Sequence, residues 1–116
     1  MGISLNIGTE DPQRLAGFYR KLWGDPLFEG GGYTSWQLGE SLITVGPHDR
    51  VKGPNKDPGR FLLSVMSTDA KTDFERYRSE GATVVRELYQ DPDAPQFWIA
   101  TFSDPDGNYI QIVQQV

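Results

Sequence analysis

The first part of the chain has the apolar pattern of a strand and then of a helix. Residues 3–7 alternate apolar and polar side chains, which predicts a half-buried strand. Asp11 and Pro12 then supply the residue types of a helix N-cap and first helical position. Apolar residues follow three and four positions apart, at Leu15, Phe18, Tyr19 and Leu22. We therefore expect an amphipathic helix ending at residues 24–26, followed by short strands near 26–29, 33–38 and 42–46.

The same order of elements begins again after a polar segment that is rich in glycine and proline. This segment, about 47–60, is predicted to be a linker. A strand is expected at 61–66, followed by a helix that Asp69 caps and Gly81 ends. Three strands complete the chain, near 83–88, 96–102 and 109–115.

A shift of 58 positions aligns the two halves of the chain. It superposes Leu5 on Leu63, Ile7 on Val65, Asp11 on Asp69 and Tyr19 on Tyr77. Such self-similarity indicates a duplicated unit. The sequence thus predicts an α+β fold of two tandem βαβββ modules in a single domain over residues 1–116. Module 1 is expected at about 1–46 and module 2 at about 61–116.

Composition narrows the classes of function. The 116 residues are 37% hydrophobic, enough for a core, and none is cysteine, which excludes disulfides and thiolate metal sites. Sixteen acidic residues against eleven basic ones give a net charge of −5, which argues against a nucleic-acid partner. No apolar run has the length of a membrane span and no signal peptide precedes the first strand, so we expect a cytoplasmic protein without a membrane partner.

The most specific string is the ending Asp104-Pro105-Asp106-Gly107-Asn108, a tight turn that leads into the last strand. Together with the two aspartate-capped module openings, it resembles the vicinal oxygen chelate superfamily. This superfamily contains glyoxalases, extradiol dioxygenases, fosfomycin-resistance enzymes and bleomycin-resistance proteins. The resemblance covers essentially the whole chain, and it implies the glyoxalase/bleomycin resistance fold, in which the modules form half-barrels around a cleft.

The resemblance also indicates where metal ligands would stand. Metal-dependent members carry a histidine seven residues before each capping aspartate and a glutamate three residues after the final asparagine. Those positions hold Ser4, Leu62 and Gln111, and the fourth falls on Ile43 or Thr44. Divalent transition metals need imidazole, carboxylate or thiolate donors. The only histidine, His48, lies in the predicted linker. We therefore expect no metal and no cofactor.

Strand alternation then predicts which residues line the cleft. Leu5, Ile7, Leu63 and Val65 are expected to face the helices. The cleft-facing set is Ser4, Asn6, Leu62, Ser64 and Met66 with Tyr109, Gln111 and Val113 of the last strand. Trp36 and Trp98 are added as candidate ligand-binding residues, although the pattern does not determine which way they face. This mixed apolar and polar lining suits a small organic molecule.

Two hypotheses of function follow. The first is a metal-independent protein of the bleomycin-resistance type that sequesters a small organic molecule, apolar or cationic. The second is a small-molecule isomerase or lyase of the glyoxalase-like type, with or without a divalent metal. The resemblance further implies a homodimer, in which modules are exchanged between chains in some members.

Overall fold

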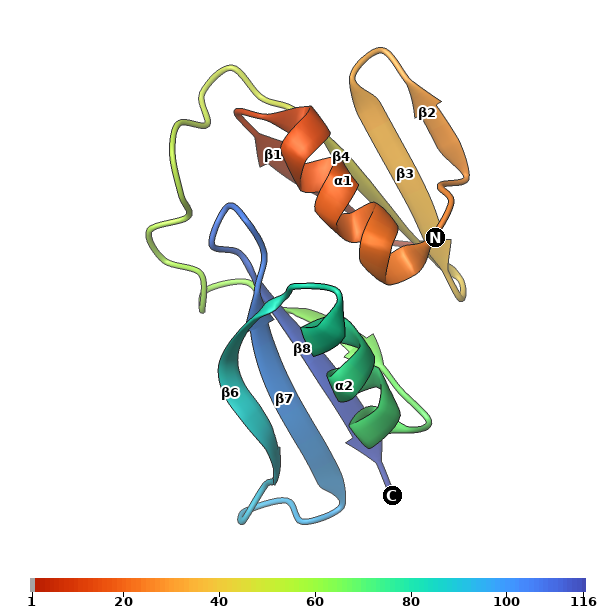
Figure 1. Cartoon of the computed structure of the whole chain (residues 1–116), viewed down its shortest axis with the longest axis vertical. Helices are drawn as coiled ribbons and strands as arrows, with labels where there is room; N and C mark the ends of the chain where they lie inside the picture. Colours follow the sequence, from red (N-terminus) through yellow and green to blue (C-terminus); the bar gives the residue numbers. More distant parts are fainter. Residues whose placement is uncertain (1) are drawn as a thin grey trace. The chain divides into compact units, whose positions relative to one another are not determined.

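The computed structural model describes residues 2–116 and contains two compact units. The first unit ends at Gly53 and the second is Pro54–Val116. Each unit has one four-stranded sheet and one helix, in the order strand, helix and three strands (Figure 1). Met1, with which the first predicted module begins, lies outside the described residues. The two predicted βαβββ modules of the α+β fold are thus confirmed.

The first module has a mixed sheet with the strand order β1-β4-β3-β2. Strand β1 pairs in parallel with β4, and the other pairs are antiparallel. The elements are β1 (Ser4–Thr9), α1 (Pro12–Trp23), β2 (Phe28–Gly30), β3 (Tyr33–Leu38) and β4 (Ser41–Pro47).

Helix α1 begins and ends as the sequence predicts. The Asp11 carboxylate accepts a hydrogen bond from the Arg14 backbone N–H at 3.2 Å, and Pro12 occupies the first turn. Gly24 ends the helix with a φ of 77°, a conformation that disfavours residues with a Cβ. The buried side of α1 carries Leu15 and Tyr19 and packs on the sheet.

The second module repeats this arrangement with the strand order β5-β8-β7-β6. Strand β5 pairs in parallel with β8, and the remaining pairs are antiparallel. Its elements are β5 (Leu63–Met66), α2 (Ala70–Ser79), β6 (Thr83–Gln90), β7 (Phe97–Ser103) and β8 (Tyr109–Gln115).

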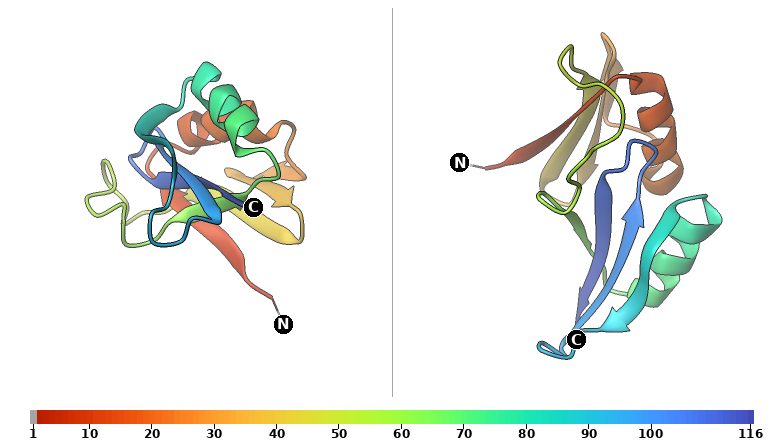
Figure 2. Two further views of the ribbon diagram at one scale, coloured as in Figure 1. Left: turned by 90° about the horizontal axis from the view of Figure 1, so that it is seen from below. Right: turned by 90° about the vertical axis from the view of Figure 1, so that its left-hand side faces the viewer.

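Asp69 caps α2 through Thr72. Its carboxylate accepts hydrogen bonds from the Thr72 hydroxyl at 2.8 Å and the Thr72 backbone N–H at 3.2 Å, and these bonds lower the pKa of Asp69. Phe74 and Tyr77 of α2 pack against Phe102 of β7, with ring centroids 5.2 and 5.7 Å apart. In each module the helix covers one face of its own sheet (Figure 2).

The predicted linker is anchored at both ends rather than free. His48 donates its backbone N–H to the Thr9 carbonyl at 3.2 Å, and Gly53 donates to the Glu10 carboxylate at 3.2 Å. On the other side of the unit boundary, Asn55 donates its backbone N–H to the Asp106 carbonyl at 2.7 Å. Each part of the segment is therefore tied to its own module.

No helix within residues 2–116 is long and apolar enough to cross a membrane.

Candidate functional site

Each sheet has a face opposite its helix, which we call the open face. The strand register decides which residues lie on it, because side chains alternate between the two faces of a strand. In the first module, Leu5, Ile43 and Trp36 are paired neighbours on the helix side, and the next row, Asn6, Thr44 and Ser35, lies on the open face. The Ser35 and Thr44 hydroxyl oxygens are 2.8 Å apart.

The second module has the same row, with an amide in its centre. Ser64 of β5, Gln111 of β8 and Thr101 of β7 are register neighbours on the open face. The Ser64 hydroxyl donates to Gln111 Oε1 at 3.3 Å, and Gln111 Nε2 donates to Thr101 Oγ1 at 3.4 Å. Three polar side chains thus form one chain of contacts across three strands.

The two rows settle which residue of the first module corresponds to Gln111. Gln111 is opposite Ser64 on the first strand of its module, and Thr44 is opposite Asn6 on the first strand of the other. Ile43 faces α1 and is 3% exposed. Of the two positions that the sequence left open, Thr44 is therefore the structural equivalent of Gln111.

The structure places most of the predicted ligand-binding residues on the open faces. In the first module these are Ser4 and Asn6, which share their face with Leu42 and Thr44. In the second module they are Ser64, Tyr109 and Gln111, and Leu62 lies exposed directly before β5. The four residues expected to face the helices do so by register.

Trp36 lies on the other side of its sheet, in the core under α1. It is 1% exposed, its ring centroid is 5.8 Å from that of Trp23, and its indole N–H donates to the Gly24 carbonyl at 2.9 Å. Its aromatic surface therefore packs between α1 and the sheet of the first module. We therefore leave Trp36 out of the site.

Trp98 also lies on the helix side of its sheet. It is paired with Gln114 and alternates with Ile99, and the next residues on its own face are Ala100 and Phe102, both buried under α2. Gln111 and Thr101 lie on the opposite face. Trp98 is therefore left out of the site as well.

Among the open-face residues that the sequence pattern did not predict are Ser35, Thr101, Arg86 and Tyr89. Ser35 and Thr101 lie on β3 and β7, where neighbouring residues on both faces are buried, so no alternation marks their direction. Arg86 and Tyr89 lie on β6, whose register shifts twice. A bulge of this kind leaves no reliable sequence signal.

The donors on the open faces do not fit a divalent transition metal. The positions that correspond to metal ligands in the resemblance carry Ser4, Leu62, Thr44 and Gln111, which offer hydroxyl and amide oxygens but neither imidazole nor carboxylate. Within residues 2–116, no group of three or more histidine, aspartate or glutamate residues is placed to hold a metal ion. What the open faces can do is donate and accept hydrogen bonds and contact apolar surface.

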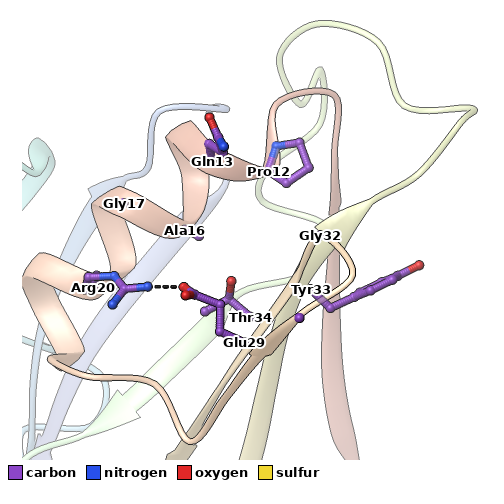
Figure 3. Close-up of a pocket in the computed structure, with 10 residues that line it drawn as sticks. Pro12, Gln13, Ala16, Gly17, Arg20, Glu29, Gly32, Tyr33 and Thr34 are labelled. Carbon is purple, nitrogen blue, oxygen red and sulfur yellow. Dashed lines mark hydrogen bonds and ion pairs between the residues drawn. The ribbon is translucent and has the colours of Figure 1, made fainter.

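A separate cavity of about 340 Å³ lies between α1 and strands β2 and β3 (Figure 3). Ala16 and Gly17 of α1 form one wall, and Thr34 contributes to the other. Its charged residues, Arg20 and Glu29, form an ion pair with each other. The cavity therefore presents no uncompensated charge to a ligand.

A second cavity, of about 580 Å³, lies beside the ends of β1 and β4 and is lined in part by His48, Asp49 and Lys52. The His48 side chain is 56% exposed, and its Nδ1 accepts a hydrogen bond from the Arg50 backbone N–H at 3.2 Å. His48 thus braces the loop that carries it.

Comparison with known proteins agrees with this architecture. A solved glyoxalase/bleomycin resistance protein/dioxygenase family enzyme from Burkholderia phytofirmans has a TM-score of 0.76 at 18% identity, over 97% of each chain. A glyoxalase/bleomycin resistance protein from Catenulispora acidiphila has a TM-score of 0.77 at 18% identity, over 100% of this chain and 99% of that one. A lactoylglutathione lyase from Agrobacterium tumefaciens has a TM-score of 0.73 at 14% identity, over 98% and 92%.

These identities are low, so the structural likeness establishes the fold alone. No curated protein matches the sequence. A family model described as a glyoxalase-like domain matches residues 3–113, nearly the whole chain. The chain therefore belongs to the glyoxalase-like domain family, as its resemblance to the vicinal oxygen chelate superfamily predicts.

Proposed function

We propose that this protein binds and sequesters a small organic molecule on the open face of its second module, without a metal. The observation that carries the proposal is the row of contacts from Ser64 through Gln111 to Thr101, at 3.3 and 3.4 Å. Gln111 stands where metal-dependent members carry a ligand, and here it offers an amide.

The length of these contacts favours exchange with a ligand. Hydrogen bonds between protein side chains are strongest at about 2.7–3.2 Å, so both Gln111 contacts are weak ones. The amide also keeps a second N–H and a second acceptor lone pair beyond those used within the row. A ligand can therefore replace or join these contacts at small energetic cost.

The corresponding row of the first module is a poorer candidate. The hydroxyl oxygens of Ser35 and Thr44 lie 2.8 Å apart, at an optimal hydrogen-bond distance. These groups satisfy each other, so a ligand gains little by replacing their contact. We therefore place the principal polar contacts of the ligand on the second module.

Apolar surface lies next to the Gln111 row. The adjacent row on the same face contains Met66, Val113 and Ile99. Met66 is 65% exposed, so the face offers hydrophobic area beside hydrogen-bonding groups. This combination supports binding of a small molecule with an apolar body and at least one polar group.

The alternative, an isomerase or lyase, needs a group that moves a proton. The open-face positions that the register assigns within residues 2–116 carry no aspartate, glutamate or histidine. This favours binding over proton transfer. The two hypotheses can be separated experimentally, because a binding protein releases the compound unchanged and an isomerase or lyase does not.

Titration of the isotope-labelled full chain, followed by nuclear magnetic resonance, tests the proposal. The panel contains bleomycin and planar aromatic acids, amides and amines. We expect shifts centred on Ser64, Thr101 and Gln111, and weaker binding in Gln111→Leu by about tenfold, the effect of losing two or more ligand hydrogen bonds. Compounds are expected to be recovered unchanged by mass spectrometry.

Gln90→Leu is the matched control, because Gln90 lies in the same sheet on the helix side and donates to the Pro95 carbonyl at 2.7 Å. It should bind as the unchanged protein does. Shifts centred on the cavity between α1 and β2–β3, or no binding across the panel, would contradict the proposal. Conversion of a compound that Gln111→Leu abolishes would favour the isomerase or lyase.

A further inference from the structure

Arg86 lies on the open face of the second module, in the same row as Gln111. The register pairs Arg86 of β6 with Thr101 of β7, and Thr101 is paired with Gln111. The row across all four strands is therefore Ser64, Gln111, Thr101 and Arg86. Arg86 is the last residue of this row, and its guanidinium is the strongest hydrogen-bond donor among the four side chains.

One irregularity in β6 turns Arg86 to the open face. Thr83 lies on the open face opposite Ser103, so strict alternation would turn Val85 and Glu87 to the open face and Arg86 toward α2. A register shift between Val84 and Arg86 reverses this. Bulges commonly re-aim a side chain in this way beside functional sites.

The second shift brings an aromatic ring to the same face. Between Arg86 and Tyr89 the register shifts again, so Tyr89 pairs with Ile99 on the open face. The Arg86 guanidinium carbon lies 3.6 Å from the centroid of the Tyr89 ring, a close cation–π contact. Stacking on the ring restricts the guanidinium to one plane and leaves its N–H edge for an acceptor.

Arg86 is not used in an ion pair, unlike other arginines of its module. Arg60 pairs with Asp57 and Arg78 with Glu75, whereas Arg86 contacts no carboxylate within residues 2–116. Among the open-face positions that the register assigns in both sheets, it is also the one charged residue. A chain with a net charge of −5 thus places a cation without a carboxylate partner in the row of Gln111.

We infer that Arg86 recognises a carboxylate on the small organic molecule, an inference that rests on the proposed function. Guanidinium binds carboxylate with two parallel hydrogen bonds. The carboxylate lies on Arg86, a further polar group of the ligand reaches Gln111, and its apolar body lies along Ile99 and Val113. The site therefore takes an organic acid, and the expectation of a cationic ligand is replaced for this face.

Matched pairs of compounds test the inference on the full chain. Benzoate is compared with benzamide, and indole-3-acetate with indole-3-acetamide, by calorimetry and by chemical-shift mapping. Each acid should bind about tenfold more tightly than its amide, as expected for a bidentate charge-assisted pair with a guanidinium. Raising the salt concentration should reduce the preference, because exposed charges are screened.

In Arg86→Gln the preference for the acid should disappear while binding of the amide is unchanged. Arg86→Lys should retain only part of the preference for the acid, because lysine keeps the charge but loses the planar pair of donors. Arg60→Gln, which removes an exposed arginine paired with Asp57, should keep the full preference.

Equal binding of acid and amide, or a preference that survives in Arg86→Gln, would overturn the inference and leave the proposed function standing. Failure of all four compounds to bind would overturn this inference, and failure of the whole panel, bleomycin and amines included, would overturn the proposed function with it. Shifts at Gln111 produced equally by the amides, with none at Arg86 on addition of the acids, would again overturn this inference alone.

Discussion

The ring of Tyr33 occupies the space directly above Gly46, which lies opposite it on the neighbouring strand. The ladder pairs Thr34 with Val45, so the preceding and following residues, Tyr33 and Gly46, are neighbours on the open face. A Cβ built at Gly46 would lie well inside van der Waals contact of the Tyr33 ring. Glycine is required here by a side chain and not by backbone conformation, because the φ of Gly46 is not positive.

Gly46→Ala should therefore destabilise the first module through Tyr33. We expect a loss of about 1–3 kcal/mol, the usual cost of overpacking. In a Tyr33→Ala background the same substitution should be nearly neutral. Chemical denaturation of the two single variants and the double variant gives the coupling free energy, and additive losses would show that the ring is not the cause.

Trp36→Phe should weaken folding without weakening ligand binding. The substitution empties part of the core beside Trp23 and leaves the Gly24 carbonyl without its indole donor. A loss of about 2 kcal/mol is expected from the cavity and the missing hydrogen bond. Thermal unfolding and ligand titration of the same sample check both parts. Normal stability with lost binding would place Trp36 back in the site.

Asp104→Ala should open the turn that precedes β8. The buried Asp104 carboxylate accepts hydrogen bonds from the backbone N–H groups of Asp106 and Asn108 at 2.9 and 3.0 Å, and from the Asn108 amide at 2.9 Å. Its removal should cost about 2 kcal/mol or more, because buried donors lose their acceptor. Asp49→Ala, at a side chain that is 94% exposed, is the control and should leave the free energy of unfolding unchanged.

The pKa of Asp69 should be lower in the folded protein than in the unfolded chain, because the Thr72 hydroxyl and backbone N–H bind the charged form. The ionised carboxylate then stabilises the fold above the ordinary aspartate pKa, and this contribution disappears as the pH falls through the lowered value. The stability difference between the unchanged protein and Asp69→Asn should therefore shrink in acid.

Thr72→Val separates the effects of the two Thr72 groups, the hydroxyl and the backbone N–H, on the pKa of Asp69. It removes the hydroxyl and keeps the backbone N–H, so the pKa of Asp69 should rise toward its ordinary value without reaching it. Titration of the side-chain carboxyl by nuclear magnetic resonance measures this directly. An unchanged pKa in Thr72→Val would contradict the assigned cause.

How far the sequence predicts the structure depends on whether a strand is buried on one face or two. Strands β1 and β5 alternate cleanly, so the helix-facing positions of Leu5 and Leu63 follow from the sequence alone. In β3, Thr34, Ser35 and Trp36 are buried in succession, and without alternation the direction of Trp36 has no sequence signal. Thr101 of β7 lies in a similar run, between the buried residues Ala100 and Phe102.

Arg86 shows a second limit. Its direction depends on where β6 departs from regular pairing, and the departure arises from the ladder with β7 and not from residues 83–90 by themselves. Alternation counted from Thr83 places the wrong residues of β6 on the open face. The sequence therefore predicts the open-face direction of Ser64 and Gln111. The direction of Arg86, the charged residue of the same row, is seen only in the folded chain.

The anchoring of the connecting segment has a consequence for how such a chain arose and how it can be altered. The backbone hydrogen bonds of His48 and Gly53 stay within one module, and those of Asn55 stay within the other, so the peptide bond between Gly53 and Pro54 carries none of them. An ancestral gene that was copied and fused at this point would have kept every such bond of both copies. We expect that a reporter domain inserted at this junction, or a split of the polypeptide there, would break none of these backbone hydrogen bonds.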